Sequence, residues 1–176
     1  MTMIKIIAVV MMSAAPAWAQ HSHSNHGQVE VLETGQAQFA SIAEIVAVLR
    51  DDPDTDWDHV DIQALRDHLV DMDNVTTRST VAVKEEGTRV IFTITGDAVV
   101  AASIQNMVIA HSPMLEAETG WSVASATIPN GATMTIAVAD DAERSQLLGL
   151  GFYGAMTIGA HHQGHHLMIA KGRSPH

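Results

Sequence analysis

The amino-acid sequence predicts an α+β fold in which two N-terminal helices precede two ββα units. The four strands are expected to form one antiparallel sheet with helices packed on one face. Apolar residues first recur every three or four positions, which is typical of helices. The period then changes to two in a pair of stretches that each contain a turn. Each of these stretches is followed by another segment with helical spacing of its apolar residues.

Two helices are predicted before the first strand. The first covers residues 39–49, and its apolar face consists of Phe39, Ile42, Ile45, Val46 and Leu49. Residues 51–56 are acidic and contain a proline, which predicts a turn. The second helix covers residues 58–72, and its apolar face consists of Ile62, Leu65, Leu69 and Met72.

Two β-hairpins are predicted from alternating patterns rich in valine, threonine and isoleucine. The first pairs residues 75–84 with residues 88–95 through a turn that ends in a glycine. The second pairs residues 120–128 with residues 132–139 through a Pro-Asn-Gly turn. Together these hairpins supply the four strands of the expected sheet.

A helix is predicted after each hairpin. The first begins at Gly96-Asp97 and runs towards Leu115, and the second covers residues 140–170 as one continuous element. Each glycine inside a helix costs about 1 kcal/mol relative to alanine. We therefore expect another element or a cofactor to pack closely against the glycines of the last helix. These are Gly149, Gly151, Gly154, Gly159 and Gly164.

The N-terminus predicts an exported protein. Residues 1–19 combine a positive Lys5, an apolar run over residues 6–15 and an Ala17-Trp18-Ala19 cleavage site, as in a signal peptide cut after Ala19. We expect a periplasmic or secreted chain with a flexible, histidine-containing arm over residues 20–36. Residues 37–176 are expected to form a single α+β domain. The chain has no cysteine, so its stability must come from the core rather than from disulfides.

The charge of the chain argues against nucleic acid and anionic membranes as partners. Its net charge is −11 with neutral histidines, and removal of Lys5 with the signal leaves 8 basic against 20 acidic residues, or −12. No stretch after the signal reaches about 18 uninterrupted apolar residues, so no membrane span is expected there. An acidic protein of this kind is expected to attract cations.

Four histidines within six residues are the most informative feature of the chain. On a continuous helix, His161, His162 and His165 extend the apolar face, whereas His166 falls at its edge. Histidines spaced i, i+4 bring two imidazoles to one face, as in helical zinc sites. A cluster that extends an apolar face predicts metal ligands. A solvated histidine surface, or a tail that binds metal adventitiously, is the alternative.

The predicted partner of this cluster is His111, which falls in the middle of the apolar face of the third helix. Met107 and Met114 flank it at the spacing of a soft ligand set. A core histidine bonded to a backbone carbonyl, with methionines as filler, is the alternative. His68 is a weaker candidate ligand, because a surface histidine in an acidic helix also explains it. His21, His23 and His26 of the arm offer a further, loose site.

These ligands predict a metal-binding function, with copper as the expected ion and zinc as the alternative, because imidazole suits both and thioether sulfur favours Cu(I). We expect a copper carrier or sequestering protein, with a periplasmic metal donor or acceptor protein as partner. A metalloenzyme with an open three-histidine site is a second hypothesis. Non-covalent haem binding through His111 or His165 is a third, and a pH-sensitive interaction module is a fourth.

Other chemistry is not supported by the sequence. The acidic run after residue 50 lacks the glycine and the bidentate glutamate of a calcium loop. The histidine cluster lacks the glutamate of a helical zinc protease, and no nucleophile elbow or phosphate-binding loop occurs. The absence of cysteine excludes covalent c-type haem.

Overall fold

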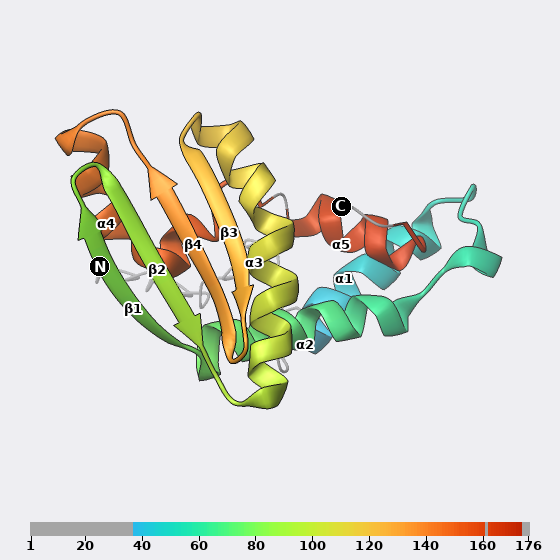
Figure 1. Ribbon diagram of the computed structural model, residues 1–176. Coiled ribbons are helices and arrows are strands. Elements are labelled where there is room, and N and C mark those ends of the chain that lie inside the picture. The colour runs from blue at the N-terminus through green and yellow to red at the C-terminus, as the bar shows by residue number, and fades with distance from the viewer. Residues whose placement is uncertain (1–36, 161, 174–176) are drawn as a thin grey trace, which may run out of the picture. The chain divides into compact units, whose positions relative to one another are not determined.

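The structure is a computed structural model that describes residues 37–160 and 162–173, all within one compact unit (Figure 1). The predicted signal peptide, the arm and His161 lie outside the described residues. The elements are α1 (Ala37–Asp51), the 3-10 helix η1 (Trp57–His59), α2 (Ile62–Arg78), β1 (Thr80–Glu86), β2 (Arg89–Thr95), α3 (Ala98–Thr119), β3 (Ser122–Ile128), β4 (Gly131–Ala137), α4 (Asp141–Ala155) and α5 (His162–Ala170).

The four strands form one antiparallel sheet in the order β1-β2-β4-β3. Each predicted hairpin is present, and the two hairpins join through β2 and β4, where Phe92 lies opposite Met134. Gly131 begins β4 next to Ile94, and a side chain at Gly131 would collide with the Ile94 carbonyl. The predicted α+β class, with an antiparallel four-stranded sheet, is confirmed.

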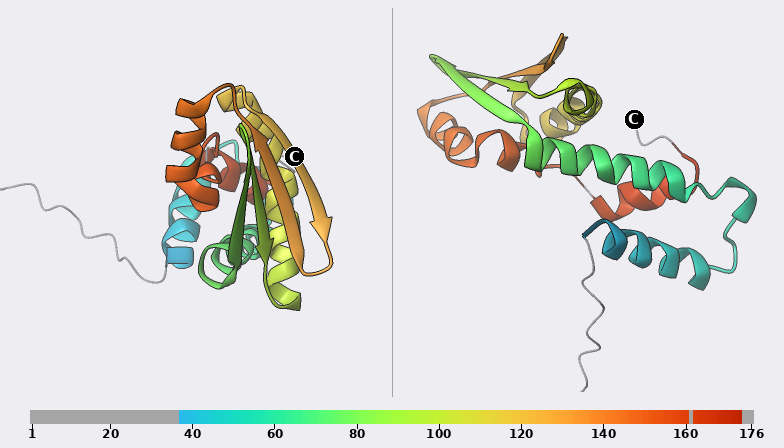
Figure 2. Two further views of the ribbon diagram at one scale, coloured as in Figure 1. Left: turned by 60° about the vertical axis from the view of Figure 1, so that its left-hand side comes forward. Right: turned by 90° about the horizontal axis from the view of Figure 1, so that it is seen from below.

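One face of the sheet carries the larger core. Alternate residues of β2 and β4 point to this face because successive side chains of a strand alternate between the two faces. Helices α3 and α4 lie on the same side of the sheet in the right-hand view of Figure 2 and pack against these residues. The fully buried residues here are Val90, Phe92, Ile94, Val100, Ile104, Val108, Leu115, Ala132, Met134, Ile136, Leu147 and Ala155.

A second apolar cluster joins α1, α2 and α5. It consists of Ile45, Leu49, Leu65, Leu69 and Ala170. Two polar contacts hold α5 in place: the Gln163 side-chain amide donates to Glu44 of α1, and the Asp61 backbone N–H donates to the Ala170 carbonyl. Helix α5 is therefore attached to the helical layer rather than to the sheet.

Helix α2 begins and ends later than predicted. It begins at Ile62, after Asp61 accepts a hydrogen bond from the Ala64 N–H, and it ends at Arg78. The prediction that residues 75–78 start a strand is wrong. The hydroxyls of Thr76 and Thr77 instead donate to carbonyls three or four residues back, and Val75 is buried in the core. Burial of one helix face here prevails over the β-propensity of threonine and valine.

Helix α3 continues beyond Leu115 to Thr119. Asp97 caps its start by accepting hydrogen bonds from the Val99 and Val100 N–H groups, and Gly120 ends it with φ 72°. Pro113 lies on an exposed side of the helix, where water can satisfy the carbonyl that loses its partner. By length and composition alone this 22-residue helix is apolar enough to cross a membrane. Its buried face packs against the sheet, as in a core helix.

The predicted continuous helix over residues 140–170 is wrong, because α4 ends at Ala155 and α5 begins at His162. Gly151 kinks α4 with φ 61°, and Gly159 adopts φ 73° in the turn between the helices. Both conformations favour glycine.

The close packing expected at the glycines of the last helix is present at Gly159, where an added Cβ would lie 2.9 Å from the Met114 carbonyl oxygen. At Gly149, Gly151 and Gly164 no other group in the described part of the chain comes within 4 Å of such a Cβ.

Candidate metal-binding site

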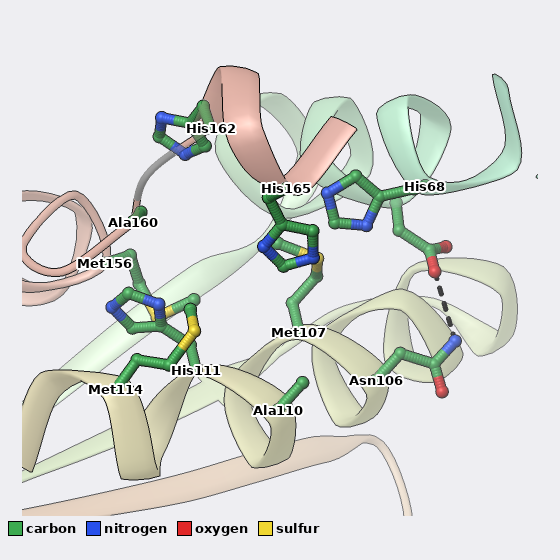
Figure 3. A pocket seen from close by; sticks show the side chains of 11 residues that line it. His68, Asn106, Met107, Ala110, His111, Met114, Met156, Ala160, His162 and His165 are labelled. Atoms are coloured by element: carbon green, nitrogen blue, oxygen red, sulfur yellow. Dashed lines mark hydrogen bonds between the residues drawn. The ribbon is translucent and has the colours of Figure 1, made fainter. Parts of the chain in front are cut away.

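A cavity of about 120 Å³ lies where α2, α3, α5 and the turn after α4 meet (Figure 3). The chain folds here so that three helices each contribute at least one histidine. The lining residues are His68 and Asp71 of α2; Asn106, Met107, Ala110, His111 and Met114 of α3; Met156 and Ala160 of the turn; and His162 and His165 of α5. Six of the predicted ligands therefore line one cavity.

Four imidazoles from two helices lie close together in the structure: those of His68, His162, His165 and His166. The rings of His68 and His165 are stacked, with centroids 5.0 Å apart and planes at 21°. His166 meets His68 edge-on at 5.6 Å and lies 6.0 Å from His162. These imidazoles thus connect α2 with α5 through ring contacts.

The stacked rings are not arranged as two ligands of one ion. Imidazole lone pairs lie in the plane of the ring, so nearly parallel rings direct them alongside each other rather than to a common point. Among residues 37–160 and 162–173, no three His, Asp or Glu side chains are positioned to hold a metal ion together. Coordination by His68 and His165 would require at least one of the two rings to turn.

His111 is a buried histidine, 4% exposed, whose Nε2 lies 3.3 Å from the Ala155 carbonyl oxygen. A carbonyl oxygen only accepts, so Nε2 carries the proton and Nδ1 is the basic nitrogen of the neutral ring. This is the backbone contact expected of a core histidine. Metal-ligating histidines commonly make the same contact with their second nitrogen, so the bond is compatible with either role.

Three methionines complete the wall of the cavity. Met107, Met114 and Met156 are partly buried. In Figure 3 the side chains of Met114 and Met156 lie beside the His111 ring, and that of Met107 lies beside His165. Met156 was not predicted as part of the site. On the predicted continuous helix it falls about 180° from the face that includes His165, and the turn after α4 removes that separation.

A polar network closes the cavity at the His68 end. The Ser103 hydroxyl and the Asn106 amide of α3 both donate to the Asp71 carboxylate, at 2.6 Å and 3.1 Å. The buried Asn74 side chain donates to Ser103 in turn. These bonds hold α2 against α3 and so set the position of His68 relative to Met107.

His166 does not line this cavity, and its environment differs from the prediction. The sequence places it at the edge of the apolar face, whereas it is one of the buried side chains of the structure, at 4% exposure. Neither ring nitrogen of His166 has a hydrogen-bond partner in the part of the chain that the structure describes. Burial lowers the pKa of His166 below its ordinary value of 6.5, and nearby His162 lowers it further, while Glu44 opposes the shift.

This pKa shift predicts an acid-sensitive stability. Well above pH 6.5 His166 is neutral in both the folded and the unfolded chain. Below that pH the unfolded chain binds a proton that the folded chain does not, so the free energy of unfolding falls until the lower, folded-state pKa is reached. Urea unfolding with a chelator present should show this loss between about pH 7 and 5.

The variant His166→Leu is expected to reduce the slope of unfolding free energy against pH over that range. His59→Ala is the matched control, since His59 is exposed and contacts Asp56 at 2.7 Å, away from the cluster. The control keeps His166 and should keep the slope. An unchanged slope in His166→Leu would show that another group causes the acid loss.

The structure brings most of the predicted ligands together. Six of them line the cavity, namely His68, Met107, His111, Met114, His162 and His165. His166 does not line it, but its ring contacts the ring of His68. His161 lies outside the described residues. Whether these groups bind metal stays a prediction. Comparison with protein families, with curated proteins and with solved structures gave no match for this chain.

Proposed function

We propose that this chain is an exported transition-metal-binding protein, a carrier or sequestering protein for copper. The observation that supports this proposal best is the shared cavity. Histidines and methionines that are far apart in sequence, on α2, α3, α5 and the turn after α4, line one space of about 120 Å³. The predicted signal peptide supports export, and the excess of acidic residues favours a cationic cargo.

The ion would first engage His68 and His165. These rings already touch, and a turn of one ring converts the stack into a convergent pair of nitrogen donors. His111 would join through Nδ1, because its Nε2–H is oriented by the Ala155 carbonyl. His162 supplies a further nitrogen donor, and the methionines supply sulfur donors to copper rather than to zinc. Such a closed His/Met set favours transport or storage over catalysis.

Titration of the full chain with Cu(II) and with Zn(II) tests this proposal. The arm histidines are first removed by His21→Ala, His23→Ala and His26→Ala, so that loose binding there does not obscure the cavity. Adding His68→Ala and His165→Ala is expected to weaken binding of both ions by at least about 100-fold, since two direct ligands are lost.

The matched control is His59→Ala in the same arm-substituted chain. It removes one exposed histidine outside the cavity and is expected to change the affinity by less than about threefold. If the double variant bound Cu(II) and Zn(II) as tightly as its parent, the cavity would not be the metal site and the proposal would be wrong.

Two alternative functions are less well supported by the site. A haem needs more room than this cavity has, because organic-ligand pockets measure about 300–1,000 Å³. In a hydrolytic metalloenzyme a carboxylate near the metal commonly acts as base, and Asp71 at this cavity already accepts hydrogen bonds from Ser103 and Asn106. A Soret band or metal-dependent hydrolysis by the purified protein would favour these alternatives.

A further inference from the structure

Methionine sulfur is concentrated around the candidate site. Six methionines follow residue 36 in the sequence. Three of them, Met107, Met114 and Met156, line the candidate metal-binding cavity. A fourth, Met72, lines an adjoining cavity of about 100 Å³ that shares Met107, Met156 and His162 with the first. The remaining two are Met134 in the sheet core and Met168 on the surface.

The donors of the candidate metal-binding cavity are divided in space. His68 and His165 stack at the end closed by Asp71, which is the acidic end. Met114 and Met156 lie at the other end, beside His111 and Ala160, and Met107 lies between the two ends, beside His165 (Figure 3). The carboxylate and the stacked imidazoles favour a harder, divalent ion. The thioethers favour a softer one.

We propose that the methionine set, Met107, Met114 and Met156 with His111, binds a monovalent soft ion, Cu(I) or Ag(I). This inference rests on the proposed function and adds the charge state of the cargo and the residues that select it. Thioether sulfur is neutral and polarizable, and among common protein-bound metals it selects Cu(I).

Burial of the site also favours a monovalent ion over a divalent one. The desolvation penalty of an ion rises with the square of its charge, so a monovalent ion is far less costly than a divalent one in a partly buried site with neutral donors. No carboxylate lines the cavity at this end among the described residues, since its acidic residue, Asp71, is bonded to Ser103 and Asn106 at the other end. This partly buried end of the cavity tolerates a single positive charge that is surrounded by neutral ligands.

The opposing interpretation is that methionines merely fill irregular gaps between helices, as their flexible side chains often do. The two interpretations differ in one measurable respect. Leucine has a similar volume and fills the same gap, but it has no sulfur. Methionine-to-leucine variants therefore keep the packing and remove the donor.

The experiment uses Ag(I), a redox-inert soft ion, as the probe on the full chain with the arm histidines replaced by alanine. The variant Met107→Leu/Met114→Leu/Met156→Leu is expected to bind Ag(I) at least about 100-fold more weakly than its parent, and Zn(II) within about threefold. Met134→Leu and Met168→Leu are the controls, one buried and one exposed, and both should leave Ag(I) affinity unchanged.

A second measurement does not depend on the folding of the triple variant. With ¹³C-methyl-labelled methionine in the parent chain, Ag(I) is expected to shift the methyl resonances of Met107, Met114 and Met156, and to leave those of Met134 and Met168 in place. Zn(II) is expected to shift these five methyl resonances less than Ag(I) does, or not at all.

The outcomes separate this inference from the proposed function. If Ag(I) affinity fell in His68→Ala/His165→Ala but not in the leucine triple variant, and no cavity methyl resonance shifted, the soft-ion site would be wrong while metal binding at the histidines would stand. If Zn(II) and Cu(II) binding survived the histidine changes but Ag(I) binding required the methionines, the proposed histidine site would fail and the methionine site would stand.

Discussion

The variant Phe152→Ala is expected to lower the free energy of unfolding by about 3–5 kcal/mol, the usual cost of removing a buried phenylalanine. Phe152 of α4 is 2% exposed and lies 6.2 Å from the ring of Phe92 on the central strand β2. It joins the second half of α4, beyond the Gly151 kink, to the sheet core. Its loss leaves a cavity between α4 and the sheet that neighbouring side chains fill only in part.

Urea unfolding of the unsubstituted chain and of Phe152→Ala, with a chelator present, measures this effect. Phe39→Ala is the matched control, because Phe39 of α1 is 67% exposed and its removal should change stability by less than about 0.5 kcal/mol. Similar losses for the two variants would mean that Phe152 does not anchor α4. The variant Phe152→Ala should also weaken metal binding, since Ala155 and Met156, which contribute to the site, lie three and four residues after Phe152.

Zinc is expected to stabilise the folded protein substantially. At a free Zn(II) concentration 100 times the dissociation constant, the free energy of unfolding should rise by about 2.7 kcal/mol, provided that the unfolded chain binds little metal. For a domain of this size each kcal/mol raises the melting temperature by roughly 2–4 °C. A rise of roughly 5–11 °C in thermal unfolding is the measurable result.

The physical reason is that the proposed site exists only in the folded chain. His68 on α2 and His165 on α5 are 97 positions apart in sequence and touch only when these helices pack together. The control is the His68→Ala/His165→Ala chain, for which Zn(II) should leave the melting temperature nearly unchanged. Equal stabilisation of both chains would contradict the cavity as the binding site.

The parts of the fold predicted correctly depend on local information. The hairpins follow from alternating side chains and glycine-containing turns, and helix α3 follows from its apolar period and from the cap at Asp97. These signals act over a few residues, so one segment of sequence contains them completely.

The errors occur where long-range packing opposes local preference. Residues 75–78 have the composition of a strand, yet burial of Val75 and the bond from Asn74 to Ser103 keep them helical. The segment after α4 has the period of a helix, yet the chain turns at Gly159. In both places the deciding contact is with α3, a separate helix. Asn74 bonds to Ser103 of α3, and Gly159 lies against the Met114 carbonyl of α3.

The sequence alone determined which donors the chain possesses and which helices they belong to. It has no cysteine, and its histidines and methionines recur on helical segments, so the sequence predicts nitrogen and thioether sulfur as the candidate donors. Only the tertiary structure decided which of them meet. Packing of α2, α3 and α5 brought His68 to His165 and buried His166, and the turn after α4 placed Met156 beside His111. Helical periodicity specifies the face on which a side chain lies, whereas the neighbour of that face depends on where the chain turns and on which helices pack together.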